Sequence, residues 1–243
     1  MNPRSESDRE AFTGEHAQLR FYGRRKGKPL KASRAGLLDE LLPELRIPAP
    51  EAALDPRTLF SFPVTEIRME IGFGGGEHLA QQALANPDIG FIGAEVFLNG
   101  VASLMRHVHD LGLKNVRVFD EDVRRLLPHL PGGSLACVSL LFPDPWPKSR
   151  HAKRRFVGPK NLREMERLIV PGGEFRMASD HPVYIDWAVM HLVRDPGFTW
   201  TAKGPEDWRT RPVDSTATRY EQKALKEGRT PVFLNFQRKA AFE

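Results

Sequence analysis

Short apolar runs alternate with longer amphipathic segments from residue 67 onward, and this alternation is the main structural signal in the sequence. The apolar runs predict strands at Ile67–Ile71, Ile89–Glu95, Val116–Phe119, Leu135–Phe142, Glu174–Ala178 and Phe233–Gln237. Apolar residues at helical spacing predict helices at His78–Ala85, Phe97–His109, Asn161–Val170 and Val183–Val193, with Pro-Gly-Gly at 171–173 ending the third. Strands that alternate with helices favour an α/β fold with a doubly wound, mostly parallel sheet.

The first 62 residues lack this alternation and are interrupted by prolines. We expect a flexible basic arm over residues 1–36, then a lead-in segment over residues 37–62. In the lead-in, Leu37, Leu38, Leu41, Leu42 and Leu45 have helical spacing and are expected to dock on the body of the protein. Residues 37–243 are therefore predicted to form a single domain, which suits a chain of 243 residues.

Composition narrows the class of protein. Hydrophobic residues make up 40% of the chain, which argues against global disorder. The sequence has no apolar run of about 18 residues and no apolar segment at its start, so we expect neither a membrane span nor a secretory signal. The single cysteine, Cys137, excludes a disulfide framework and a cysteine-based zinc site, and a cytoplasmic location is expected.

Charge is clustered although the net value is only +5. No acidic residue occurs between His16 and Leu38, where seven lysines and arginines fall, and a second basic run spans Lys148–Arg155. Either run alone is compatible with a solvated tail or helix face. Two such runs in one chain favour a polyanionic partner.

The segment Glu70–Glu77, with sequence EIGFGGGE, lies where the first strand passes into the first helix. Glycines such as Gly72 and Gly74 allow a tight turn and a close approach to a ligand, although a simple glycine-rich turn is the alternative. In a dinucleotide-binding G-x-G-x-x-G loop the last position would be Glu77, and its charge would repel a pyrophosphate. S-adenosylmethionine carries a sulfonium and an ammonium, so an acidic loop favours this cofactor.

Acidic residues also follow the next two strands. Glu95 ends the second strand and can accept hydrogen bonds from both ribose hydroxyls of an adenosine; the alternative is a favourable charge at a helix N-terminus. Asp122 follows the third strand and can accept from an adenine amino group, although it could equally cap the next segment. Asp120 and Glu121 compete for the adenine contact.

The segment after the fourth strand combines a carboxylate, an indole and a dense basic run. Three prolines within Pro143–Pro147 stiffen the loop at the carboxyl end of a buried strand, which is the usual ligand edge of such sheets. An aromatic ring beside cations suits a nucleobase with its phosphates, because the ring stacks and the cations hold the backbone. A rigid structural loop carrying solvated charge is the alternative.

Residues Pro143–Arg155 resemble the bacterial tRNA (guanine-N7-)-methyltransferase family of the TrmB type. The resemblance extends from about Leu59 to the C-terminus and includes Glu70–Gly76, Phe91–Glu95, Ser179-Asp180 and Thr218–Glu221. Two departures are Ser179, where threonine is common, and Gln222–Gly228, whose basic positions differ. The resemblance implies a Rossmann-like class I methyltransferase fold with an antiparallel last strand, and methylation of a guanine N7 in the variable loop of tRNA by S-adenosylmethionine.

The resemblance also implies site residues. The expected cofactor-binding residues are Glu70, Gly72, Gly74, Glu95, Asp122 and Asp144, with Asp144 also the expected catalytic residue. The expected substrate-binding residues are Lys148, Asp180, Thr218, Arg219, Tyr220 and Glu221. The basic run supplies expected RNA contacts at Arg150, His151, Lys153, Arg154 and Arg155.

The chemistry of guanine N7 needs no metal and no general base, because this nitrogen carries a lone pair and no proton. We expect tRNA as the partner and a monomer as the working state.

Without the family resemblance, capping by Asp180 and a surface turn at Thr218–Glu221 would be preferred. The rival functions are a methyltransferase for another RNA base or a small molecule, and a non-catalytic RNA-binding Rossmann protein. Deletion of the residues before Leu37 is expected to weaken tRNA binding and to reduce its salt dependence.

Overall fold

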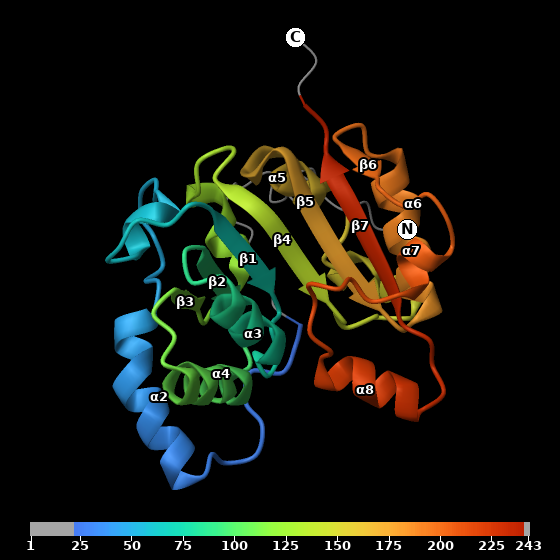
Figure 1. Ribbon diagram of the computed structural model, residues 1–243. Helices are drawn as coiled ribbons and strands as arrows, with labels where there is room; N and C mark the ends of the chain where they lie inside the picture. The colour runs from blue at the N-terminus through green and yellow to red at the C-terminus, as the bar shows by residue number, and fades with distance from the viewer. Residues whose placement is uncertain (1–21, 241–243) are drawn as a thin grey trace, which may run out of the picture.

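In the described part of the chain, seven strands form one sheet in the order β3-β2-β1-β4-β5-β7-β6 (Figure 1). The computed structural model describes residues 22–240. The strands are β1 (Ile67–Ile71), β2 (Gly90–Ala94), β3 (Val116–Phe119), β4 (Leu135–Leu141), β5 (Ile169–Ser179), β6 (Phe198–Trp200) and β7 (Val232–Arg238). Strands β1 to β5 pair in parallel, whereas β7 runs antiparallel to both β5 and β6. The predicted α/β class, the mostly parallel sheet and its antiparallel last strand are confirmed.

Helices cover both faces of the sheet. The α-helices are α2 (Ala32–Leu45), α3 (Glu77–Ala85), α4 (Leu98–Leu111), α5 (Pro159–Leu168), α6 (Pro182–Arg194), α7 (Glu206–Arg209) and α8 (Arg219–Lys226). Short 3-10 helices are η1 (Pro56–Leu59), η2 (Val123–Arg125), η3 (Leu127–His129) and η4 (Ser149–Arg154). Helices α3 and α4 lie on one face, with α2 against α4, and α5 and α6 lie on the other (Figure 1).

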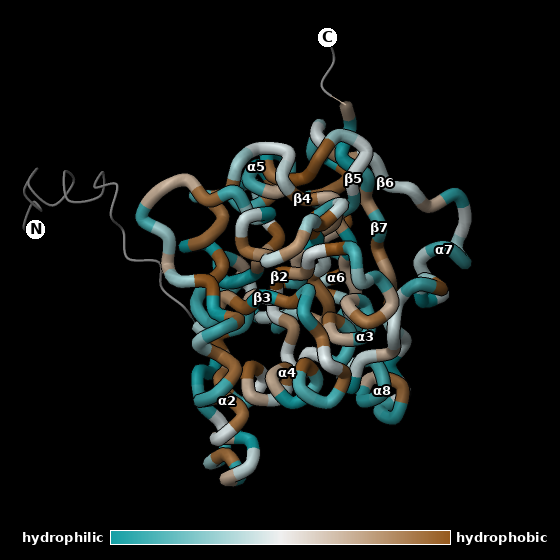
Figure 2. Tube along the Cα trace, turned by 60° about the vertical axis from the view of Figure 1, so that its left-hand side comes forward, coloured by the Kyte–Doolittle hydropathy of each residue, from teal (hydrophilic) through white to brown (hydrophobic). Residues whose placement is uncertain are grey.

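Two apolar cores follow from the alternation of side chains along the strands. On β1, the side chains of Ile67, Met69 and Ile71 join the core under α5 and α6. On the opposite face, Phe91 and Val118 pack with residues of α3 and α4. Figure 2 shows hydrophobic trace along the central strands. The layers fix the carboxyl ends of β1 to β5 along one edge, where ligands bind in such sheets.

The structure adds elements that the sequence pattern does not predict. Strand β6, helix α7 and helix α8 were not expected, and the segment at Thr218–Glu221 begins a helix instead of forming a surface turn. Strand β5 starts at Ile169, so Pro-Gly-Gly at 171–173 lies inside a strand, and the pairing with β4 is irregular there. A Cβ on Gly173 would lie 2.6 Å from the Ala136 carbonyl oxygen, so glycine permits the close approach of the two strands.

The lead-in segment docks as expected. Helix α2 begins at Ala32, inside the predicted arm, and buries Leu38, Leu42 and Leu45. Asn99, near the start of α4, accepts from the Gly27 N–H at 2.7 Å and donates to the Lys28 carbonyl at 2.8 Å. The described end of the arm is therefore tied to α4, while the arm residues 1–21 lie outside the described part of the chain. Between residues 22 and 240, no helix combines the length and apolar character of a membrane span.

Candidate active site

The loop between β1 and α3 is a chain of glycines that adopt conformations other residues avoid. Gly72, Gly74 and Gly76 have φ angles of 71°, 57° and 79°. The Gly72 N–H donates to the Ala94 carbonyl at 2.8 Å, which joins the loop to the end of β2. No atom lies within 4 Å of the position of a Cβ on Gly72, so the loop borders open space there. Gly72 is therefore the exposed point of the loop, whereas Gly74, Gly75 and Gly76 are buried.

The first turn of helix α4 packs directly against this loop. A Cβ on Gly100 would lie 2.1 Å from the Gly74 carbonyl oxygen, a contact that no side chain can make. Gly100 is therefore required for the first turn of α4 to reach the loop. The sequence analysis missed this glycine because it stands alone within a helical pattern.

Glu95 is the carboxylate that organises the loop. One oxygen accepts from the Gly74 N–H at 2.9 Å, and the other accepts from the Phe97 N–H at 2.8 Å. Burial raises the pKa of Glu95, and these backbone hydrogen bonds oppose the rise. Glu95 thus connects the end of β2, where the sequence places it, to the glycine loop.

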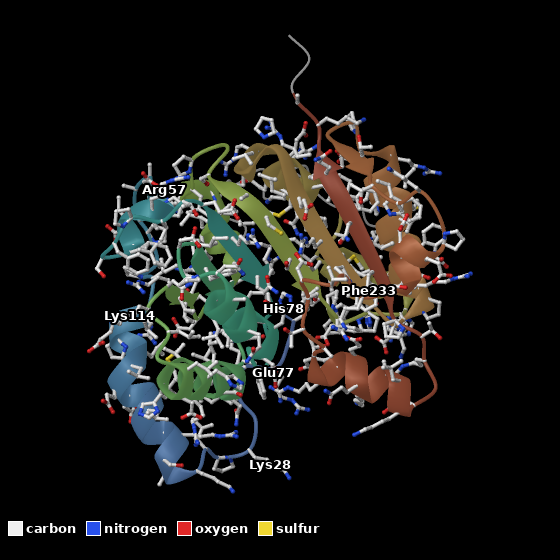
Figure 3. All side chains as sticks on the ribbon, viewed as in Figure 1. Lys28, Arg57, Glu77, His78, Lys114 and Phe233 are labelled. Atoms are coloured by element: carbon white, nitrogen blue, oxygen red, sulfur yellow. The ribbon has the colours of Figure 1, made fainter. Side chains whose placement is uncertain are left out.

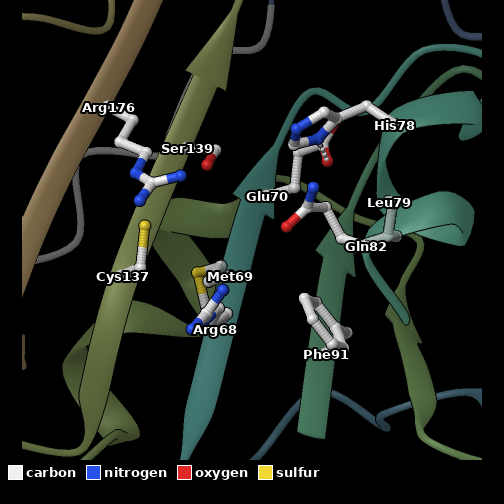
Figure 4. A pocket seen from close by; sticks show the side chains of 10 residues that line it. All are labelled: Arg68, Met69, Glu70, His78, Leu79, Gln82, Phe91, Cys137, Ser139 and Arg176. Carbon is white, nitrogen blue, oxygen red and sulfur yellow. Dashed lines mark hydrogen bonds and ion pairs between the residues drawn. The ribbon is translucent and has the colours of Figure 1, made fainter. Parts of the chain in front are cut away.

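Glu70 lies in the interior of the sheet rather than in the open loop. Its side chain contacts Nδ1 of His78 at 2.8 Å, and both side chains are buried (Figure 4). Burial lowers the pKa of His78, but the charge of Glu70 and its hydrogen bond outweigh this, so the pKa is raised overall. The pair joins the end of β1 to the first turn of α3, on either side of the glycine loop. His78 was not among the predicted site residues.

The acids after β3 are all engaged with arginines. Asp122 caps η2 by accepting from the Arg124 N–H at 3.0 Å and also binds the Arg124 guanidinium. Asp120 pairs with Arg46 at 2.6 Å, and Glu121 pairs with Arg125. The capping role that the sequence left open for Asp122 is therefore present in the structure, and the adenine contact remains a prediction.

The loop after β4 carries strain on both sides of Asp144. Phe142 and Trp146 have φ angles of 50° and 41°, values that bulky residues adopt only where surrounding structure imposes them. Asp144 itself is exposed between them. Arg155 fixes the loop, because its guanidinium donates to the carbonyls of Pro145 at 3.1 Å and Trp146 at 2.9 Å.

The basic run divides into exposed and packed members. Lys148, Arg150 and Lys153 are exposed, and their contacts with RNA stay a prediction. The guanidinium of Arg154 lies 4.7 Å from the ring centre of Trp146 and 4.5 Å from that of Tyr22 in the arm. His151 packs edge-on against Trp146. The buried Arg155 fits a loop-holding role better than the phosphate contact that the sequence suggested for it.

The predicted substrate residues lie at the end of β5 and the start of α8. Asp180 pairs with Arg229 at 2.7 Å. Thr218 caps α8 by accepting from the Glu221 N–H at 3.1 Å, and the buried Glu221 side chain accepts from Arg211 at 3.1 Å. A guanidinium therefore orients each of the two carboxylates.

The start of α8 reaches the glycine loop. A Cβ on Gly74 would lie 2.9 Å from the Tyr220 ring, and Nε of Arg219 lies 3.0 Å from a carboxylate oxygen of Glu77. The segment before α8 is held by Asp214, whose carboxylate accepts from Arg176 at 2.7 Å and whose carbonyl accepts from Gln82. The structure thus brings Thr218–Glu221 beside the predicted cofactor loop. The two segments are more than 140 positions apart in the sequence.

Comparison with known proteins identifies the family. The family described as "Putative methyltransferase" matches residues 65–234. The tRNA (guanine-N(7)-)-methyltransferase of Rhodospirillum rubrum is 52% identical over 90% of this chain and 88% of its own length. The enzyme of the same name from Nitrobacter hamburgensis is 48% identical over 98% of this chain and 94% of its own length. The chain belongs to the tRNA (guanine-N(7)-)-methyltransferase family.

Solved structures support the fold of this methyltransferase. A crystal structure of the 16S rRNA methyltransferase KamB superposes with a TM-score of 0.54, at 16% identity, over 76% of this chain and 91% of that one. An rRNA methylase from Streptococcus thermophilus gives 0.50 at 11% identity, over 73% and 89%. Such distant likeness establishes the class I methyltransferase architecture alone.

The residues present fit the methyl donor of the family. A sulfonium and an ammonium favour carboxylates, and Glu95 is held at the glycine loop with its oxygens on backbone N–H groups. Gly72 leaves the space a ligand needs, and Gly74 and Gly76 allow the sharp turn. Within residues 22–240, no three His, Cys, Asp or Glu side chains gather closely enough to hold a metal ion.

Proposed function

We propose that this protein transfers the methyl group of S-adenosylmethionine to N7 of a guanosine in the variable loop of tRNA. Family membership at 52% identity over 90% of the chain supports the reaction. The geometric observation that supports the proposal is the convergence of Glu95 and Tyr220 on Gly74. Glu95 accepts from the Gly74 N–H at 2.9 Å, and the Tyr220 ring lies 2.9 Å from the position of a Cβ on Gly74.

The target atom determines what the protein must supply. Guanine N7 has an in-plane lone pair and no proton, so no side chain needs to act as a general base. S-adenosylmethionine supplies an electrophilic methyl carbon on a positively charged sulfur. The side chains have two tasks, which are to align the purine with that carbon and to stabilise the positive charge that passes to the ring.

Asp144 suits both tasks. Its carboxylate lies at the carboxyl end of β4, in a loop whose shape is imposed by strained backbone at Phe142 and Trp146. A carboxylate held there can accept a hydrogen bond from the exocyclic amine of the purine. Its negative charge also offsets the charge of the methylated base. The strain on either side of Asp144 supports a functional role, because such conformations concentrate at reacting sites.

Three acceptors are available to select guanine. Its Watson–Crick edge presents N–H donors, which only acceptors can bind, and Asp180, Glu221 and the Thr218 hydroxyl are acceptors of this kind. The exposed Lys148, Arg150 and Lys153 lie beyond Asp144 and would hold the phosphates of the flanking nucleotides. We expect the protein to act in the cytoplasm as a monomer.

The decisive experiment is labelled methyl transfer from S-adenosylmethionine to unmodified tRNA transcripts. We expect transfer to a transcript with a guanosine in the variable loop. Transfer should cease when 7-deazaguanosine replaces that nucleotide, because a C–H group then stands in place of N7. Mass spectrometry of nuclease digests locates the label. Transfer that survives the 7-deaza substitution, or a label on another base, would overturn the proposed target; no transfer to any tRNA would overturn the function.

A further inference from the structure

Arg219 lies directly on the backbone of the glycine loop. A Cβ built on Gly75 would be 1.5 Å from Nη2 of Arg219 and 2.4 Å from its Cζ. Nε of the same guanidinium is 3.0 Å from the Glu77 carboxylate. Figure 3 shows Glu77 on the side of α3 that faces α8. The side chain remains half-exposed. A cation is therefore held against a loop whose other charged groups are carboxylates.

The cofactor carries a negative group as well as positive ones, and the acidic residues of the loop cannot bind the negative group. S-adenosylmethionine has two cationic centres, but the methionine end also carries a carboxylate. Glu77 and Glu95 would repel that group. A guanidinium is the side chain best suited to a carboxylate, because its planar fork donates two parallel hydrogen bonds.

The sheet order indicates where the carboxylate would lie. The predicted adenine and ribose contacts follow β3 and β2, which lie on one side of β1. The methionine end must then extend the other way along the edge, toward β1 and β4. Helix α8 lies on that side of α3 (Figure 1), with Tyr220 against Gly74 and Arg219 against Gly75. Arg219 is thus the cation at the end of the site where the carboxylate is expected.

We propose that Arg219 binds the carboxylate of the methionine end of S-adenosylmethionine, and so draws the start of α8 onto the glycine loop. The inference rests on the proposed function and changes the expected role of Arg219 from substrate contact to cofactor contact. Glu77 engages Nε and leaves the two Nη groups for the ligand. Because Thr218 and Glu221 share this first helical turn, occupation of the cofactor site also fixes two of the guanine-binding acceptors.

A pair of cofactors separates this role from the others. Decarboxylated S-adenosylmethionine keeps the adenosine, the sulfonium and the amine, but lacks the carboxylate. Binding of both compounds to the full chain is measured by calorimetry for wild type, Arg219→Gln, Arg219→Lys and Lys223→Gln. Lys223 is the matched control, because it lies on the same helix and its side chain is exposed at 68%. Adenosine, which lacks the whole amino-acid end, reports whether each variant is folded.

We expect wild type to bind S-adenosylmethionine about 10- to 100-fold more tightly than the decarboxylated form, the size of a hydrogen-bonded pair with a charged group. Arg219→Gln should abolish this ratio while adenosine binding stays unchanged. Arg219→Lys should retain part of it, and Lys223→Gln all of it.

An unchanged ratio in Arg219→Gln would overturn the inference, even if its KM for tRNA rises, because that pattern would assign Arg219 to the RNA. Failure of wild type to bind S-adenosylmethionine at all would instead overturn the proposed function. Equal binding of the two cofactors by wild type would exclude a carboxylate subsite while leaving the methyltransferase activity intact. The three results are distinguishable in one set of titrations.

Discussion

The loops that follow β1 and β4 lie at the same edge of the sheet but differ in how much of their binding geometry is already built. Around the first loop, the Glu70 carboxylate at the end of β1 is bound to His78, and the Glu95 carboxylate after β2 is bound to backbone N–H groups. After β4, Asp144, Lys148 and Arg150 are exposed to solvent. The carboxylates around the first loop are already hydrogen-bonded within the protein, whereas the second loop combines a strained backbone with exposed charged side chains.

The contrast matches the two partners. A small cofactor with fixed charges gains most from preorganised groups that need no rearrangement. A polyanion gains instead from solvated cations, whose contribution comes from the release of counterions and tolerates loose geometry. Within the second loop, the strained residues Phe142 and Trp146 fix the backbone around Asp144. The second loop is therefore preorganised only where the reaction is expected to occur.

Of the changes that test this contrast, replacement of Asp144 should have the largest effect on the rate of methyl transfer. We expect Asp144→Ala to reduce single-turnover methyl transfer by about 100-fold or more, the usual loss of a group that stabilises developing charge. Affinity for S-adenosylmethionine, measured by calorimetry, should change only a few-fold because Glu95 and the glycine loop remain. Asp39→Asn, which removes an exposed charge on α2, is the control and should transfer at the wild-type rate. A wild-type single-turnover rate in Asp144→Ala would remove this residue from the reaction.

Gly100→Ala tests whether the first loop depends on close packing. The new methyl would collide with the Gly74 carbonyl oxygen, and neither backbone can yield cheaply. We expect a loss of about 1 to 3 kcal/mol in the free energy of unfolding and at least a tenfold loss of S-adenosylmethionine affinity. Gly36→Ala is the matched control, since no atom lies within 4 Å of its added Cβ. Urea unfolding of Gly36→Ala should show a gain of up to about 1 kcal/mol; equal behaviour of the two variants would refute the packing argument.

The strands and principal helices could be predicted because their apolar period is long enough to recognise. Strand β6 has only three residues, Phe198–Trp200, and gives no period. The start of β5 was hidden because Pro171–Gly173 has the composition of a turn, although Gly173 allows the strand to pass close to Ala136. Helix α8 had a visible signal, since Thr218 with Glu221 three residues later is a capping pattern.

The site residues could be predicted by type but not by partner. Acids after successive strands indicated a cationic ligand, yet Asp120 meets Arg46 from 74 positions away in the sequence. The contact of Arg219 with Gly75 joins α8 to the first loop and has no local signature. The burial of Arg155 is equally invisible in a basic run whose members Lys148, Arg150 and Lys153 are exposed. Pairings of this kind depend on the fold, so a sequence pattern gives the inventory of charges and leaves their partners open.

Neutralising the second loop should weaken tRNA binding without touching the cofactor. Arg150→Gln and Lys153→Gln are each expected to lower the slope of log affinity against log salt by about 0.7 to 0.9, if each contacts one phosphate. Affinity for S-adenosylmethionine should stay at the wild-type value. Filter binding at several salt concentrations measures the slope. Lys114→Gln is a comparison outside both basic runs, and an equal change in its slope would show a general charge effect instead of a defined RNA surface.

The smallest effect should come from the buried pair beneath the first loop, and it should depend on pH. Because the Glu70 carboxylate raises the pKa of His78 overall despite burial, the folded state holds this proton more tightly than the unfolded state. The resulting stabilisation is complete below the ordinary histidine pKa of about 6.5. It is lost as pH rises through the higher pKa of the folded state. Urea unfolding at pH 5.5 and 8.5 should therefore show a larger advantage of wild type over His78→Gln at the acidic pH. In the Glu70→Gln background the same comparison should lose this extra acidic advantage, because the carboxylate that raises the pKa is gone. An acidic advantage that persists there would mean that another carboxylate, such as Asp214, sustains the raised pKa of His78.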